Sequence, residues 1–160
     1  MTLDAALFRQ VMSRFASGVT VVTTSHAGEL YGLTVSSFTS LSLEPRLALV
    51  CLDGRTRIHA AIAAAQVFAI NILASDQEAL SRHFAGPQKH DWSATAHTLG
   101  LHGTPLLNGA LATLECRLAN TFPGGDHTIV VGEIEQANAA DGAPLVYYRA
   151  GYHALTALED

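Results

Sequence analysis

Segments rich in β-branched and other apolar residues recur along this chain without helical patterns alternating between them. They cover residues 18–24, 30–38, 46–52, 67–73, 110–122 and 127–139. Parallel strands need a crossover of a dozen or more residues, usually a helix, whereas antiparallel strands need only a turn. The pattern therefore predicts a mainly β fold of the α+β class, an antiparallel barrel with peripheral helices, rather than βαβ winding.

Three helical segments accompany these strands. Apolar residues at four-residue spacing predict an amphipathic helix over residues 3–16, which Gly18 ends. An alanine-rich helix begins near Thr56, and Ser75 with Glu78 three residues later forms the capping box of a short helix. The uninterrupted apolar run 46–52 predicts a strand buried on both faces, and the polar, glycine-containing stretch 86–109 reads as a long loop.

The amino-acid composition is that of a folded domain with few charged residues. Of 160 residues, 49% are hydrophobic and 14% charged, against roughly 25% charged in an average soluble chain. We expect one domain over residues 1–160, with surplus apolar surface for a subunit interface. A net charge of −5 and the lack of a basic cluster argue against nucleic acid as a partner. Cys51 and Cys116 lie in apolar runs and are expected to be buried free thiols, which favours the cytoplasm. The apolar runs are too short for a membrane span.

Several common catalytic signatures are missing. The chain contains no GxGxxG after a strand, no phosphate-binding GxxxxGK[ST] loop and no GxSxG nucleophile turn. Its eight histidines show no metal-ligand spacing, since HExxH is absent and the pair His97 and His102 has no cysteine nearby. We therefore expect no metal site.

Two segments carry groups suited to ligand binding. Residues 33–42 hold six hydroxyl side chains, which form either a polar edge strand or a rim that grips a planar heteroaromatic ligand. At residues 53–61, Thr56 is placed to cap a helix whose free N–H groups attract anions, and Arg55 and Arg57 flank it. These arginines are either solvated surface or part of a phosphate site.

Residues 123–133 offer a third candidate. Gly124 and Gly125 predict a tight turn, Asp126 follows, and His127 opens a strand. The segment is either a hairpin turn with an exposed histidine or a site in which Asp126 fixes the histidine tautomer. Asn71, a polar residue in an apolar strand, is expected to be a structural amide.

Taken together, five motifs in order resemble the short-chain flavin reductases. The motifs are F-x-x-V-M-x-R-F-A-S-G-V-T-V-V-T-T at 8–24, G-L-T-V-S-S-F-T-S-L-S-L-E-P at 32–45, F-A-I-N-I-L-A at 68–74, L-S-R-H-F-A at 80–85 and G-D-H at 125–127. These enzymes are the reductase components of two-component flavin-dependent monooxygenases. The resemblance implies an FMN-binding split β-barrel, a homodimer, and NADH- or NADPH-dependent reduction of FMN or FAD, with the reduced flavin passed to a partner monooxygenase.

The resemblance also implies site residues. The cofactor-binding candidates are Thr34, Val35, Ser36, Ser37, Cys51, Leu52, Asp53, Arg57, Ile58, His83 and Phe84. His127 is the catalytic candidate beside the nicotinamide, and Tyr152 is a second candidate on that side. Arg46 stands where the family commonly has a second proline after Pro45, which leaves FMN and FAD both open.

Hydride transfer between two cofactors needs little acid–base help from the protein. We therefore expect positioning, rather than one essential side chain, to carry catalysis. The alternative function is a non-catalytic flavin-binding carrier or sensor.

Overall fold

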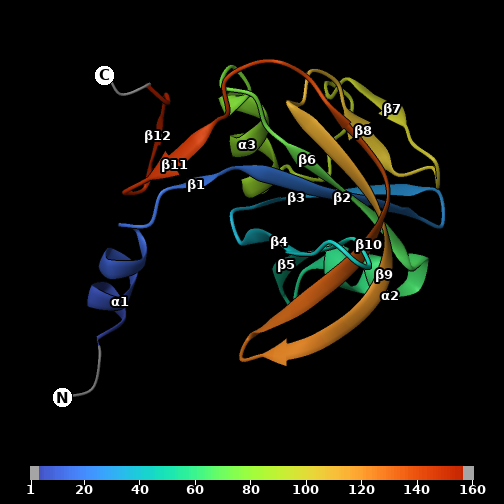
Figure 1. The fold of residues 1–160 in the computed structure, drawn as a ribbon, viewed down its shortest axis with the longest axis horizontal. Helices are drawn as coiled ribbons and strands as arrows, with labels where there is room; N and C mark the ends of the chain where they lie inside the picture. Colours follow the sequence, from blue (N-terminus) through green and yellow to red (C-terminus); the bar gives the residue numbers. More distant parts are fainter. Residues whose placement is uncertain (1–3, 157–160) are drawn as a thin grey trace.

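The computed structural model describes residues 4–156, which are dominated by one strongly curved antiparallel sheet (Figure 1). Its seven strands run in the order β3-β2-β6-β9-β10-β5-β4. They comprise Glu29–Val35 (β3), Thr20–His26 (β2), Val67–Ile72 (β6), Ala112–Gly124 (β9), His127–Ala139 (β10), Leu47–Asp53 (β5) and Phe38–Ser42 (β4). The prediction of a mainly antiparallel β fold is confirmed. The hydrogen-bonded order is open at β3 and β4, so the described strands do not close into a complete barrel.

Two hairpins set the register of the sheet. β2 and β3 join through Ala27 and Gly28, both at positive φ, as a two-residue turn between right-twisted strands requires. The long β9 and β10 join through Gly125 and Asp126, with Gly125 at φ +75°. This second turn is the one that the sequence predicts, and it places the start of β10 opposite the end of β5.

Helices cover both faces of the sheet. Successive residues of a strand point to opposite faces, and the neighbours Val21 and Val22 of β2 enter different clusters. Val22 packs with Ile58 and Ile62 from α2, which spans Arg57–Ala65. Val21 packs with Phe84 from α3, which spans Glu78–Ala85. The sheet is therefore buried on both sides at its centre.

The N-terminal helix is shorter than predicted. α1 spans Ala5–Met12, with the Asp4 carboxylate accepting a hydrogen bond from the backbone N–H of Ala6, and Leu3 lies outside the described residues. Gly18 does not end the helix. It belongs to the short strand β1, Ser17–Gly18, which pairs with β11 (Val146–Tyr148), and β11 pairs in turn with β12 (Gly151–His153).

Three further sequence expectations are wrong in detail. Ser75 and Glu78 form no capping box, because α3 begins at Glu78 behind Gln77, whose side chain binds the backbone N–H of Ala74 instead. β5 is not buried on both faces: buried and half-buried residues alternate along it. The stretch 86–109 is not only loop, since β7 (His97–Leu99) and β8 (Pro105–Leu107) pair within it.

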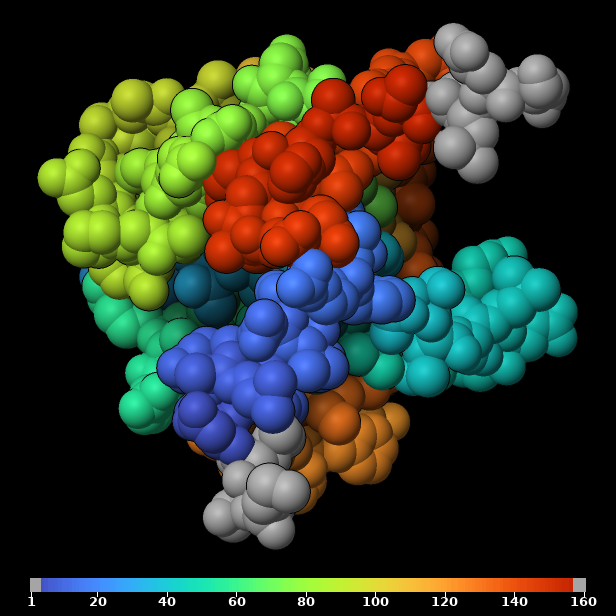
Figure 2. All heavy atoms as spheres, turned by 90° about the vertical axis from the view of Figure 1, so that its left-hand side faces the viewer, coloured from blue at the N-terminus to red at the C-terminus, as the bar shows by residue number. Residues whose placement is uncertain are grey.

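Apolar side chains remain uncovered on α1 and on the hairpin that joins β4 to β5. None of the residues of α1 is buried, and both Phe15 and Leu43 are 79% exposed. In Figure 2 the helix, drawn in blue, lies on the surface below β11 and β12, and the cyan hairpin projects from the body of the molecule. Within residues 4–156, no helix is long and apolar enough to cross a bilayer.

Candidate functional site

Three neighbouring cavities share Ser36, the residue that follows β3. The inner cavity, of about 310 Å³, lies among the ends of β3 and β5 and the starts of α2 and β10. The middle cavity, of about 190 Å³, lies between β3, α3 and the β11–β12 pair. The outer cavity, of about 610 Å³, separates α1 from the β3–β4 connection. Ser36 is the point at which all three adjoin.

The inner cavity combines hydroxyl and apolar walls. Its lining residues are Leu33, Thr34, Val35, Ser36, Ser37, Cys51, Asp53, Thr56 and His127. They come from four separate segments, which the antiparallel order brings together at one end of the sheet. The hydroxyl-rich segment is therefore a cavity rim, as well as the end of an edge strand.

Ser37 fastens the β3–β4 connection to β5. Its hydroxyl oxygen lies 3.0 Å from the carbonyl oxygen of Cys51, to which it donates, and 3.1 Å from the Cys51 backbone nitrogen, from which it accepts. One side chain thus satisfies both backbone groups of Cys51 just past the last pair of the β4–β5 ladder, Phe38 with Val50. The half-buried Cys51 side chain faces the inner cavity.

A chain of hydroxyl contacts joins β3 to the middle cavity. The Thr34 hydroxyl donates to the backbone carbonyl of Ser81 at 2.7 Å, and the Ser81 and Tyr152 hydroxyl oxygens are also 2.7 Å apart. The guanidinium of Arg82 lies 4.9 Å from the centre of the Tyr152 ring. Tyr152 is therefore held in place at the opposite side of Ser36 from His127.

The start of α2 supplies an electropositive edge to the inner cavity. Thr56 is the N-cap residue, as predicted, but its hydroxyl donates to the Asp53 carbonyl at 2.7 Å and makes no cap bond. The first N–H groups of α2 therefore lack a side-chain acceptor and remain able to bind an anion. Arg55 binds Asp53 through its side chain and backbone, which holds the pKa of that carboxyl well below its usual range.

Arg57 points away from the inner cavity. Its guanidinium lies 2.7 Å from a carboxylate oxygen of Glu29 and 5.4 Å from the centre of the Tyr31 ring. The side chain lines a separate, fourth cavity that also contains His90 and Trp92. Thr56 and Arg57 therefore face two different cavities from adjacent positions.

His127 and Asp126 lie in direct contact. The Nδ1 atom of His127 is 2.8 Å from an Asp126 carboxylate oxygen, and this histidine lowers the pKa of that carboxyl. The pair forms because Asp126 occupies a turn, where side chains are not constrained to opposite faces. Asp126 therefore orients the histidine ring, as the sequence suggested, at the mouth of the inner cavity.

Some predicted site residues do not present their side chains to these cavities. Leu52, Ile58 and Phe84 are core residues, each at most 3% exposed, so contact with a ligand would be limited to their backbone. The His83 ring binds the backbone carbonyl of Asp91 at 2.8 Å. Asn71 is a structural amide as predicted, bonded to the backbone of β2 and to Leu107.

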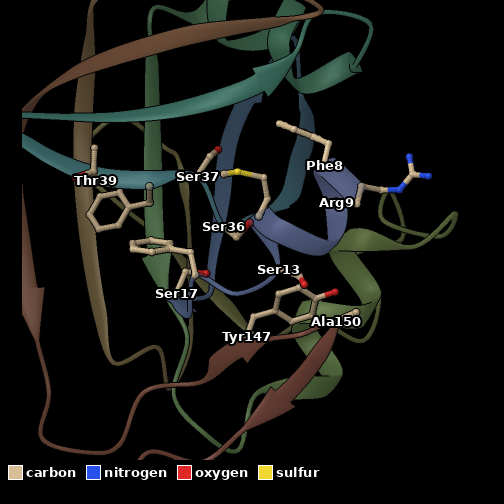
Figure 3. Close-up of a pocket in the computed structure, with 12 residues that line it drawn as sticks. Phe8, Arg9, Ser13, Ser17, Ser36, Ser37, Thr39, Tyr147 and Ala150 are labelled. Carbon is tan, nitrogen blue, oxygen red and sulfur yellow. The ribbon is translucent and has the colours of Figure 1, made fainter. Parts of the chain in front are cut away.

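The sequence prediction missed the wall that α1 and β11 provide. Phe8, Met12 and Phe15 line the outer cavity, and Tyr147 lines both the outer and the middle cavities. Figure 3 shows Phe8 directed toward Ser37 while Arg9 extends away from the cavity, with Tyr147 on the opposite side. The four-residue spacing of α1 was visible in the sequence, but it indicated only an amphipathic helix and not a cavity wall.

The chain matches a known protein family over most of its length. Residues 12–156 match the family described as flavin reductase like domain. This chain belongs to that family.

No cluster of three or more histidine, cysteine, aspartate or glutamate side chains suited to a metal ion occurs in the part of the chain that the structure describes.

Relatives of this flavin reductase-like chain include two curated proteins from Rhodococcus. It is 47% identical to the reductase component of the 4-nitrophenol 4-monooxygenase/4-nitrocatechol 2-monooxygenase of Rhodococcus opacus, over 92% of this chain and 79% of that protein. It is 40% identical to an NADH-dependent flavin reductase of a Rhodococcus species, over 94% of this chain and 86% of that protein.

Solved structures agree with the family assignment. The NADH:FAD oxidoreductase SgcE6 of Streptomyces globisporus C-1027, solved with NAD and FAD fragments, superposes with a TM-score of 0.93 at 34% identity. The match covers 98% of this chain and 96% of that one. The resemblance to the short-chain flavin reductases and the predicted fold class are therefore confirmed.

Proposed function

We propose that this chain is an NADH-dependent flavin reductase that delivers reduced flavin to a separate monooxygenase. The observation that carries the proposal is the convergence of three cavities on Ser36, in a chain of the flavin reductase-like family. Its relative in Rhodococcus opacus is a reductase component of a monooxygenase. When bound, the flavin accepts at N5 the hydride released from C4 of the reduced nicotinamide.

The inner cavity fits the flavin ring and its ribityl chain. A planar heteroaromatic ring needs apolar walls and a few oriented polar groups, and Leu33 and Val35 alternate there with hydroxyl residues. Thr34, Ser36 and Ser37 supply these polar groups, together with the backbone of the β3–β4 connection. Cys51 and Asp53 complete the wall on the side of β5.

Thr34 and Ser36 line both the inner and the middle cavities, so the two cavities adjoin at these residues. We assign the nicotinamide to this junction, between His127 on one side and Tyr152 on the other. These residues orient the rings and exclude water rather than transfer a proton at a fixed atom. The hydroxyl-rich lining, with His127 held by Asp126 at its mouth, suits a reaction in which positioning of the two rings dominates.

A direct assay tests this function. Purified protein is mixed with NADH and an excess of FMN or FAD, and NADH consumption is followed by absorbance. Oxidation that depends on added flavin supports the proposal. Binding of flavin without NADH or NADPH oxidation would instead identify the chain as a flavin carrier or sensor.

The Arg57 guanidinium can reach a phosphate at the start of α2 only by leaving Glu29, and on that basis its removal is expected to weaken FMN binding by roughly tenfold and leave riboflavin binding unchanged. Riboflavin lacks the phosphate, and a hydrogen bond to a charged group contributes ~1.5–3 kcal/mol. Titrations of Arg57→Ala with both flavins measure the difference. Arg117→Ala is the control, since Arg117 is also paired with a glutamate, Glu135, on the surface. Equal losses for both flavins would exclude a phosphate contact at Arg57.

We further propose that the chain is a homodimer whose interface includes α1 and the β4–β5 hairpin. Contiguous exposed apolar surface of this kind marks an interaction site. Leu7 and Val11, one turn apart on α1, are 49% and 57% exposed, and Leu41 and Leu43 are uncovered on the hairpin. A second copy would cover these side chains and close the outer cavity.

Leu43→Asp is expected to convert the dimer to a monomer, because it places a charge where an apolar contact is proposed. Light scattering coupled to size exclusion measures the mass. Leu99→Asp is the matched control, since Leu99 is 65% exposed on a different strand, β7. Dissociation by Leu99→Asp but not by Leu43→Asp would place the interface elsewhere.

A further inference from the structure

Ser81 is a fully buried polar residue of α3 that the reductase function proposed above leaves without a role. It shares the buried face of that helix with Phe84, whose ring packs against Trp92 at 5.0 Å between ring centres. A hydroxyl group without access to solvent is normally retained because it has specific hydrogen-bond partners. The partners of Ser81 lie on the two sides of the middle cavity.

Ser81 joins two strands that do not pair with each other. Its hydroxyl oxygen lies 2.7 Å from the hydroxyl oxygen of Tyr152 on β12, and its backbone carbonyl accepts a hydrogen bond from Thr34 on β3 at 2.7 Å. β3 and β12 belong to different sheets. One residue of α3 therefore connects Thr34, at the rim of the inner cavity, to Tyr152, in the wall of the middle cavity.

The bond to Ser81 differs in kind from the other contacts of the Tyr152 ring. The Arg82 guanidinium lies 4.9 Å from the centre of that ring, and the Tyr147 ring meets it at an angle of 63°, 5.3 Å away between centres. Contacts of this kind hold an aromatic ring in place without directing its hydroxyl group. The hydrogen bond to Ser81 supplies that direction, and with it the orientation of the ring toward the middle cavity.

We propose that Ser81 is a positioning residue that holds the Tyr152 ring against the nicotinamide and sets its place relative to the flavin. The proposal rests on the reductase function given above, in which the nicotinamide lies between His127 and Tyr152. The Ser81 side chain exposes no surface and its hydroxyl is bonded to Tyr152, so it acts through the tyrosine and not on a ligand.

The second bond, from Thr34, gives this position its value for the reaction. Thr34 lines the proposed flavin cavity, and it is bonded to the same residue as Tyr152. The two walls that face the reacting rings are thus held at a fixed separation through α3. Hydride transfer depends on that separation, because the rate falls steeply when reacting groups are displaced.

Ser81→Ala, Tyr152→Phe and the double variant test the proposal. Each single change removes the bond between the two hydroxyls, and we expect each to slow hydride transfer about fivefold, the factor that corresponds to one ordinary hydrogen bond. The double variant should be no slower than the single ones, because the bond can be lost only once. Stopped-flow measurement of a single turnover gives the rate, and the KM for flavin should be unchanged.

The affinity for NAD⁺ gives a second measurement, without turnover. Titration of the flavin-loaded protein should show binding weakened about fivefold in each variant, again without a further loss in the double variant. Thr24→Val is the matched control. It also removes a fully buried hydroxyl, one that donates to the Val67 carbonyl at 2.7 Å, but Thr24 borders none of the four cavities. It should lower the melting temperature by about 4 °C and change neither the hydride-transfer rate nor the NAD⁺ affinity.

Two outcomes would overturn the role of Ser81 while the reductase function stands. One is a double variant in which the two losses multiply, since the residues would then act independently. The other is a Ser81→Ala protein that melts at a lower temperature but transfers hydride and binds NAD⁺ as the wild type does, which would make the contact purely structural. Failure of the wild type to oxidise NADH in the presence of flavin would instead overturn the function itself.

Discussion

Ser36→Phe is expected to lower kcat/KM for flavin reduction by about 100-fold or more. Ser36 lines all three neighbouring cavities, so an aromatic ring at this position obstructs the flavin and nicotinamide sites together. Small displacements of reacting groups cost rates of this size. Ser36 is exposed, so the new ring displaces no core residue and the fold should persist. Steady-state kinetics with NADH and flavin measure the loss.

Two further variants separate obstruction from other causes. Ser36→Ala removes the hydroxyl without adding volume, and we expect it to retain most of the activity. Asn138→Phe adds the same ring at an exposed position near the far end of β10 and should leave kinetics unchanged. Wild-type kinetics in Ser36→Phe would show that the cavities meeting at Ser36 do not hold the reactants.

Gly132→Ala is expected to lower the free energy of unfolding by about 3 kcal/mol, as overpacking of a core does. A Cβ at Gly132 would lie 2.5 Å from the Phe68 ring and 2.7 Å from the Cβ of Cys116. The Cβ of Cys116 is fixed to its backbone, so no rotamer change relieves that contact and β9 and β10 must shift apart. Both neighbours are fully buried. A melting temperature lower by about 10 °C is the corresponding thermal result.

Gly18→Ala is the matched control for this prediction. It is the same substitution in a strand, but a Cβ at Gly18 would meet no atom within 4 Å. We expect a change in unfolding free energy close to zero. Near-equal stability of the two variants would mean that the close packing at Gly132 relaxes at little cost.

The sequence was sufficient to predict the long strands because their patterns are long and β-branched, whereas the three-residue strands β7 and β8 were predicted as loop. β6, β9 and β10 lie within two residues of their predicted limits. Ends of helices were less predictable, because they depend on tertiary partners: α1 ends at Met12 rather than at residue 16, and α3 begins behind Gln77, whose amide donates to the distant carbonyl of Asn108. Local capping rules cannot include such distant hydrogen bonds.

The site was predicted in part for a similar reason. The hydroxyl segment, Asp53 and His127 were identified, and the structure brings them to one cavity. Arg57 was expected at that same cavity. The sequence does not show that Glu29, the first residue of β3, would bind its guanidinium and direct it elsewhere. Leu52 and Ile58 were predicted to bind the cofactor because of their positions in the family's motifs. Their places in β5 and α2 direct both side chains into the core instead.

The two hydrogen bonds between the Ser37 hydroxyl and the Cys51 backbone have a consequence for the exchange of ligand with solvent. Ser37 lies just past the β4–β5 ladder, whose last pair is Phe38 with Val50, so its two hydrogen bonds are the final link between this connection and β5 at the cavity rim. A reductase that passes its product to another protein must release it repeatedly. We expect the hydrogen bonds at the end of the ladder to open more readily than those inside it, so release of the flavin would proceed past Ser37 without separating the strands of the core.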